Sequence, residues 1–244
     1  MELTGKVVLI VGGGGGMGLA IGRALAAEGC KVALSDCDEQ VLAQAAASAD
    51  FKTPPAWRTC DITDRAQVAR LYEWLAATLG PVDILVNCAG TNIGNRMLAN
   101  IDPDGLDRVM AINFTGAFNV IHAALPAMRE KRAGLIFQIV SLAGLRVMPM
   151  AGLPYCTSKF AMGALGTFVN LEECEKNGIR VTNIYPGETN TPLVDKRPTP
   201  PPPEKRAQML QPEDIAACVV AVAKLPPRAV VPELVITPTH MLLG

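Results

Sequence analysis

The sequence predicts an α/β protein built as one doubly wound parallel sheet of about seven strands, with helices on both faces. Short apolar runs rich in β-branched residues alternate with helical patterns along the chain. Such alternation is typical of βαβ units, whose right-handed crossovers place helices on both sides of a parallel sheet. Nothing in the composition marks a linker before residue 195, so we expect a single domain over residues 1–244.

The seven expected strands are short, apolar and bounded by glycine, proline or polar residues. They cover residues 6–11, 31–35, 56–60, 82–87, 134–141, 179–185 and 233–236. Pro186 and Gly187 end the sixth of these runs.

The expected helices fill the intervals between the strands. Their patterns extend to about residue 28, and then cover residues 41–49, 64–79, 103–131, 153–177 and 212–224. Local signals support several of them. Asp64 stands near the start of the third, Gly178 follows the fifth, and Pro212 occupies the first turn of the last.

One segment departs from this order. Residues 196–206 contain Pro198 and the run from Pro200 to Pro203, which predicts an extended polyproline conformation and neither a helix nor a central strand. The segment is either a surface lid, which we place at residues 190–211, or a recognition motif for a partner.

Composition excludes several classes of function. The net charge is −1, and no cluster of Lys or Arg is long enough to gather nucleic acid or an anionic membrane. The chain has seven scattered cysteines without a CxxC pair and only two histidines, so we expect no metal site and no disulfide framework. With no recognisable signal peptide, and with apolar runs broken by Gly, Pro or charge, we expect a soluble cytoplasmic protein.

A glycine-rich loop joins the first strand to the first helix. Gly12, Gly16 and Gly18 lie where a tight turn and a close approach of the backbone to a pyrophosphate would both need glycine. The helix that follows offers free N–H groups and a favourable dipole to an anion. A plain flexible turn is the alternative. The position after a strand favours a dinucleotide and a Rossmann-type sheet.

Asp36 ends the second strand and bears on which dinucleotide binds. A carboxylate there can accept hydrogen bonds from the adenosine ribose hydroxyls, and it would repel a 2′-phosphate. Its neighbours Ser35 and Cys37 are not basic, so the sequence favours NAD over NADP, unless Asp36 only serves a surface turn. Asp61, after the third strand, either meets the adenine amino group or caps a turn.

Four polar residues form a candidate reacting group. Tyr155 and Lys159 lie four apart on one expected helix face, where an ammonium would lower the pKa of the phenol and make it an acid/base group. Ser141 ends the fifth strand at the carboxyl edge, where ligands of such sheets bind. Asn113 is an amide inside an apolar helical stretch, where it needs partners if it is buried.

In these segments the chain resembles the short-chain dehydrogenase/reductase family over essentially its whole length. The shared segments, in order, are the Gly12–Gly16–Gly18 loop, Asn87-Cys88-Ala89-Gly90, Asn113, Ser141, Tyr155-Cys156-Thr157-Ser158-Lys159, and Pro186-Gly187 with Thr191. Val11 and Cys88 depart from the common pattern, which has Thr and Asn there. The C-terminal segment also lacks an Asp-Gly-Gly that many relatives carry.

The resemblance implies a role for each matching residue. Tyr155 would be the general acid/base, Ser141 would orient the substrate oxygen, and Lys159 would lower the pKa of Tyr155 and hold the nicotinamide ribose. Asn113 would hold a water that relays protons through Lys159. The implied cofactor contacts are Gly12, Gly16, Met17, Gly18, Asp36, Asp61, Ile62, Asn87, Ala89, Gly90, Tyr155, Lys159, Pro186, Gly187, Thr189 and Thr191.

The expected function is hydride transfer between NAD(H) and an alcohol or ketone substrate, by a homodimer or homotetramer. The pocket would be apolar, lined by Leu142, Met148, Met150, Leu153, Leu193 and Met209, with Arg146 and Glu188 as nearby charged candidates. Two alternatives stay open: a 3-oxoacyl thioester (acyl-carrier or CoA) reductase that uses NADPH, and a non-catalytic NAD-binding oligomer.

Overall fold

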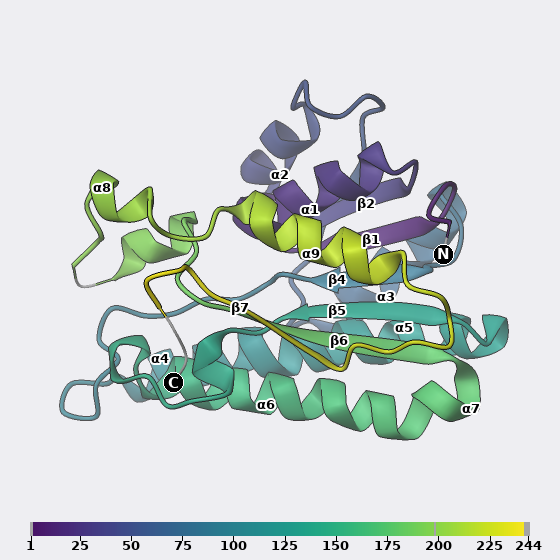
Figure 1. Ribbon diagram of the computed structural model, residues 1–244. Helices are drawn as coiled ribbons and strands as arrows, with labels where there is room; N and C mark the ends of the chain where they lie inside the picture. Colours follow the sequence, from purple (N-terminus) through teal and green to yellow (C-terminus); the bar gives the residue numbers. More distant parts are fainter. Residues whose placement is uncertain (1, 198, 242–244) are drawn as a thin grey trace.

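The computed structural model describes residues 2–197 and 199–241 and contains one seven-stranded parallel sheet (Figure 1). The strand order is β3-β2-β1-β4-β5-β6-β7, which confirms the predicted doubly wound sheet. The strands are β1 (Val7–Val11), β2 (Lys31–Asp36), β3 (Ala56–Thr59), β4 (Ile84–Asn87), β5 (Gly134–Ile139), β6 (Ile179–Pro186) and β7 (Glu233–Ile236).

The sheet reverses its order between β1 and β4, and this reversal opens a crevice at the carboxyl ends of the strands. The register brings Val11 opposite both Ser35 of β2 and Asn87 of β4. The segments that follow these strands therefore begin at the same edge of the sheet. They are the glycine loop, the end of β2 at Asp36, and the chain from Cys88 onward.

Helices cover both faces of the sheet (Figure 1). On one face, α1 (Gly16–Ala27), α2 (Glu39–Ala46) and α9 (Pro212–Ala223) pack on the strands through residues such as Ile10, Leu25 and Val219. On the other face, α3 (Arg65–Thr78) and α5 (Ala117–Lys131) pack through residues such as Leu9 and Leu71. Both faces of the central strands are thus buried, which explains their unbroken apolar sequences.

The two longest predicted helices are interrupted by π-helical turns. Residues 103–131 form α4 (Pro103–Met110), a π turn at Ala111–Gly116, and α5. Residues 153–177 form α6 (Leu153–Val169), a second π turn at Asn170–Cys174, and the short α7 (Glu175–Asn177). Such turns are often found at functional sites, and the first of them contains Asn113.

The helical region Pro103–Lys131 is long and apolar enough to cross a membrane by length and composition. The expectation that every apolar run is broken too early for a bilayer is therefore wrong for this segment. Its apolar residues, among them Val120, Ile121 and Ala124, are buried against the sheet and α3. The region is a core helix of the fold.

The proline-rich segment is not wholly extended, contrary to the prediction. A 3₁₀ turn covers Pro192–Lys196, and a four-residue helix, α8, covers Pro203–Arg206. A helix can start at Pro203 because the first turn of a helix does not use its N–H groups. Pro198 lies outside the described residues. Figure 1 shows α8 beyond the carboxyl ends of the strands.

Candidate active site

The glycine loop needs glycine at positions 12 and 18, because backbone atoms occupy the space that a Cβ would take there. A Cβ on Gly12, whose φ is +74°, would lie 2.7 Å from the Ala89 nitrogen, and a Cβ on Gly18 would lie 2.1 Å from the Gly12 oxygen. At Gly15, by contrast, a Cβ would meet nothing within 4 Å. The loop is thus packed tightly on β4 and α1 and open where a pyrophosphate would approach the start of α1.

Beside this loop lies a cleft of about 690 Å³ that fits a dinucleotide. Its lining contains ten of the predicted cofactor contacts: Gly12, Gly16, Met17, Gly18, Asp36, Asp61, Ile62, Ala89, Gly90 and Thr191. Asn87 is the exception at the end of β4, because it is fully buried and both polar atoms of its amide lack a hydrogen-bond partner among the described residues. Asn87 does not line the cleft, and its contact with a cofactor stays a prediction.

The two acidic residues of the cleft, Asp36 and Asp61, have different hydrogen-bond partners. Asp36 accepts a hydrogen bond from the Gly14 N–H (3.2 Å) and another from the Cys37 N–H (2.8 Å), so it braces the glycine loop. Asp61 accepts from the N–H (2.9 Å) and the hydroxyl (2.7 Å) of Thr63. Asp61 therefore caps a turn, one of its two predicted roles, while it also lines the cleft.

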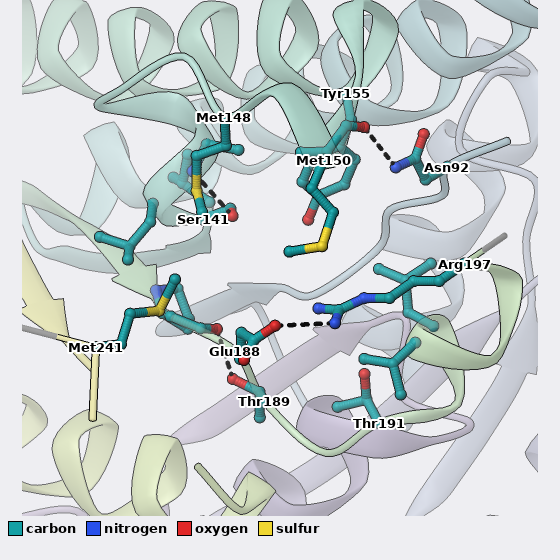
Figure 2. Close-up of a pocket in the computed structure, with 18 of the residues that line it drawn as sticks. Asn92, Ser141, Met148, Met150, Tyr155, Glu188, Thr189, Thr191, Arg197 and Met241 are labelled. Atoms are coloured by element: carbon teal, nitrogen blue, oxygen red, sulfur yellow. Dashed lines mark hydrogen bonds and ion pairs between the residues drawn. The ribbon is translucent and has the colours of Figure 1, made fainter. Parts of the chain in front are cut away.

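Tyr155 and Ser141 lie side by side at the wall of a second, smaller cavity of about 130 Å³ (Figure 2). Tyr155 is in the first turn of α6, and Ser141 stands two residues beyond β5. Burial raises the pKa of Tyr155 above its usual value, while a hydrogen bond with Ser141 and the charge of Arg197 act to lower it. The phenol and the Ser141 hydroxyl thus belong to the same wall of the cavity.

Lys159 lies one turn further along α6 and is almost fully buried. Its ammonium donates to the Ile139 carbonyl at 3.0 Å and lies 5.6 Å from the centre of the Tyr155 ring. Burial lowers the pKa of Lys159 from 10.5 to about 8. The ammonium therefore lies over one face of the ring. The groups that lower the pKa of Tyr155 are Ser141 and Arg197, and Lys159 is not among them.

Asn113 ties a loop to α6 from its place in the π turn. Its Nδ2 donates to the Thr91 carbonyl (3.0 Å) and the Ser158 hydroxyl (2.9 Å), and its Oδ1 accepts from the Thr91 N–H (2.8 Å). The Lys159 ammonium is close by, since a Cβ on Gly90 would lie 3.3 Å from Lys159 Nζ and 3.5 Å from Asn113 Oδ1. The buried amide of Asn113 thus has the hydrogen-bond partners that a polar group in an apolar helix needs.

The small cavity contains most of the predicted pocket. Leu142, Met148, Met150 and Leu193 line it, whereas Leu153 and Met209 do not. Leu153 is exposed at the start of α6, and Met209 is buried elsewhere after α8. Four predicted cofactor contacts line this cavity and not the cleft: Pro186, Gly187, Thr189 and Tyr155. Met17, Thr191 and Leu193 line both the cavity and the cleft, so the two spaces adjoin.

The charged residues at the cavity differ from the predicted pair. Glu188 lines it as expected, but Arg146 is exposed and does not. Arg96 and Arg197 also line it and were not predicted from the sequence. Arg96 reaches the cavity from the loop after β4 and Arg197 from the proline-rich segment. The sequence offered one signal for each of them. Arg96 follows a strand that ends at the carboxyl edge, and Arg197 lies in the segment predicted as a lid.

Comparison with known proteins identifies the family. Residues 6–201 match the model of the short chain dehydrogenase family, which is most of the chain. The protein belongs to this family, as the resemblance of its motifs implied. It is an oxidoreductase that binds a nicotinamide cofactor and acts on a small molecule.

Individual relatives support this assignment. Glycine betaine reductase from Emericella nidulans is 35% identical over 97% of this chain, which spans only 19% of that longer protein. An uncharacterised oxidoreductase from Staphylococcus saprophyticus is 31% identical over 98% of this chain and 99% of its own length. A solved serine dehydrogenase with NADP⁺ has a TM-score of 0.89 at 25% identity, covering 98% of this chain and 97% of its own. Levodione reductase has a TM-score of 0.86 at 26% identity, covering 97% and 98%.

Proposed function

We propose that the protein transfers a hydride between NAD(H) and the carbinol carbon of a small alcohol or its ketone. The observation that carries the proposal is the position of Tyr155. Tyr155 and Ser141 both line a small cavity, and that cavity adjoins the dinucleotide cleft. A proton-transfer group and a hydride carrier would thus meet at one substrate carbon.

Four residues of the site would each have a separate role in the reaction. Ser141 orients the substrate oxygen, and Tyr155 takes or gives the proton of that oxygen. Lys159, whose ammonium lies 5.6 Å from the centre of the ring, would hold the nicotinamide ribose. Asn113 is a positioning residue, because its amide fixes Thr91 against α6; the relay of protons through a held water remains a prediction. The bound nicotinamide supplies or accepts the hydride.

The preference for NAD is part of the proposal. Asp36 lines the adenosine end of the cleft, and its neighbours Ser35 and Cys37 carry no positive charge. The solved serine dehydrogenase holds NADP⁺, so an NADPH-dependent 3-oxoacyl thioester reductase is the second candidate. A cavity of about 130 Å³ favours a small substrate over an acyl thioester.

The direct test is the reduction of NAD⁺ and NADP⁺, followed by absorbance, with a panel of alcohols and the reverse reaction with ketones. We expect Tyr155→Phe to reduce turnover by about 10²- to 10⁴-fold, because it removes the acid/base group, and to leave NADH binding nearly unchanged. Tyr72→Phe is the matched control, since the Tyr72 hydroxyl donates to the Val120 carbonyl far from both cavities. Full turnover in Tyr155→Phe would overturn the assignment. Absence of turnover with every substrate would favour the non-catalytic oligomer.

Assembly and location also remain predictions. We propose a homodimer or homotetramer in the cytoplasm. Exposed apolar side chains on the outer helices, among them Phe118, Phe168 and Leu171, support packing between subunits. Sedimentation that shows only monomer would contradict the assembly.

A further inference from the structure

The substrate cavity has two guanidinium groups in its wall, from Arg96 and Arg197. Both line this cavity, and neither lines the dinucleotide cleft. They therefore lie on the substrate side and away from the space that fits the phosphates of a cofactor. Figure 2 shows Arg197 extending into the cavity toward Glu188, beside Met150.

Arg96 is held in place by the segment that carries Tyr155. The residue is buried, with an exposed fraction of 5%. Its carbonyl accepts from the Leu153 N–H at 3.1 Å, and its Nε donates to the Gly94 carbonyl at 3.4 Å. A Cβ on Gly152 would lie 2.5 Å from the Arg96 Cβ, so only glycine allows this close packing. Arg96 is thus a fixed part of the wall next to the first turn of α6.

Arg197 approaches the same space from the lid segment. It is close enough to Arg96 for its charge to contribute, after burial, to a lowered pKa of Arg96, and close enough to Tyr155 to lower the pKa of the phenol. The two guanidiniums therefore line the same cavity as the reacting hydroxyl.

Glu188 is the carboxylate among the described residues that line this cavity. Glu188 accepts from Arg197 Nη1 at 2.9 Å and lies 4.0 Å from the Lys205 ammonium and 3.7 Å from the His240 ring nitrogen. Asp195, the next acidic residue along the lid, pairs with Arg206 instead. Glu188 thus pairs with Arg197 and Lys205, and the wall of the cavity presents the guanidiniums of Arg96 and Arg197 to a ligand that enters it.

We propose that Arg96 and Arg197 bind a carboxylate of the substrate, so that the substrate is a small hydroxy acid and the product the corresponding oxo acid. Guanidinium groups match the planar carboxylate and can bind it through paired N–H donors. The inference rests on the proposed function for its chemistry: the hydroxyl proton goes to Tyr155, and the hydride, with its two electrons, goes to the oxidised nicotinamide. The small cavity limits the acid to a few carbon atoms.

Matched substrates test the charge directly. We expect oxidation of 3-hydroxybutyrate or 2-hydroxybutyrate with a lower KM than that of the corresponding methyl ester. Arg96→Met and Arg197→Met should each raise the KM of the acid by about 10- to 100-fold and leave that of the ester nearly unchanged. Arg146→Met is the matched control, since Arg146 is exposed and outside the cavity lining. Equal KM values for acid and ester in the wild-type enzyme would overturn the inference.

A binding measurement separates this inference from the proposed function. Butyrate, which cannot be oxidised at a hydroxyl, should bind the NADH- or NADPH-loaded protein in calorimetry at least tenfold more tightly than butyramide. Arg96→Lys and Arg197→Lys keep the positive charge and serve as controls in case the Met variants misfold. They should weaken the binding of butyrate less than the Met variants do. Butyrate bound without turnover of any alcohol would refute the proposed function alone. Turnover of alcohols with equal binding of butyrate and butyramide would refute the carboxylate site alone.

Discussion

The preference for NAD⁺ over NADP⁺ can be tested by a single isosteric substitution at Asp36. Asp36→Asn removes the negative charge and keeps an oxygen that can accept the hydrogen bond from the Gly14 N–H, 3.2 Å away in the wild type. The glycine loop should therefore keep its shape. We expect the variant to gain activity with NADP⁺ and to lose little with NAD⁺.

The size of the effect follows from the charges. A 2′-phosphate carries a charge of about −1.5 to −2, and two unit charges at about 4 Å interact with about 1 kcal/mol in water and about 4 kcal/mol at an effective dielectric constant of 20. Asp36 is half-buried at the rim of the cleft, so an intermediate value applies. A repulsion of about 2 to 4 kcal/mol corresponds to a preference for NAD⁺ of roughly 30- to 700-fold.

The assay is kcat/KM for NAD⁺ and NADP⁺ at one ionic strength, because salt screens the repulsion. The ratio should shift toward NADP⁺ by at least 30-fold in Asp36→Asn. Asp38→Asn is the control: Asp38 caps α2 through the Gln40 and Val41 N–H groups and does not line the cleft. A wild-type enzyme that prefers NADP⁺, or a ratio unaffected by Asp36→Asn, would refute the reasoning.

Two further predictions concern the packing of the site. Lys159 has a pKa of about 8 in the folded protein and 10.5 as its ordinary value, so the unfolded chain binds more protons between these pH values. The free energy of unfolding of the wild type should therefore rise by about 3 kcal/mol relative to Lys159→Met from pH 7.5 to 10.5, measured in urea; a difference independent of pH would contradict this. Gly18→Ala should weaken NADH binding at least tenfold in a fluorescence titration and destabilise the protein by about 1–3 kcal/mol, because its Cβ would lie 2.1 Å from the Gly12 oxygen. Gly94→Ala, where a Cβ meets nothing within 4 Å, should do neither, and equal effects of the two variants would show that local packing is not the cause.

The sheet could be predicted because its signal is local and repeated. Each central strand is a run of apolar residues buried on both faces, as in Val7–Val11, and each is followed by a turn and a helical pattern. The handedness of the crossovers then leaves few arrangements. The carboxyl edge follows from the strand direction alone, so Asp36 and Ser141 could be placed near one another without coordinates.

The interruptions of the helices could not be predicted in the same way. A π turn changes the hydrogen bonding of one turn and leaves the apolar pattern of Ala111–Gly116 helical. The burial of Asn113 was a clue, because a buried amide needs partners, but the sequence does not say that Thr91 and Ser158 provide them. The helix at Pro203–Arg206 was missed for another reason. A proline run disfavours a helix interior, whereas it allows a helix to begin.

The charges of the cavity show where sequence reasoning fails most. Arg96 and Arg197 are 101 positions apart and reach the cavity from irregular segments, whose paths no periodic pattern encodes. Only the packed structure shows that Gly152 admits Arg96 against α6 and that Glu188 holds Arg197.

This arrangement couples the lid to the charge of the substrate. Arg197 belongs to the proline-rich segment, and Glu188, its partner, lies two residues after β6. A substrate carboxylate would share Arg197 with Glu188, whereas a neutral alcohol would leave the guanidinium on Glu188 alone. An acid therefore adds a contact between the lid and the reacting hydroxyl that a neutral substrate lacks, and that contact would hold the carbinol against Tyr155 and Ser141. The advantage of an acid should then appear in kcat as well as in KM, because the contact positions the carbon that reacts.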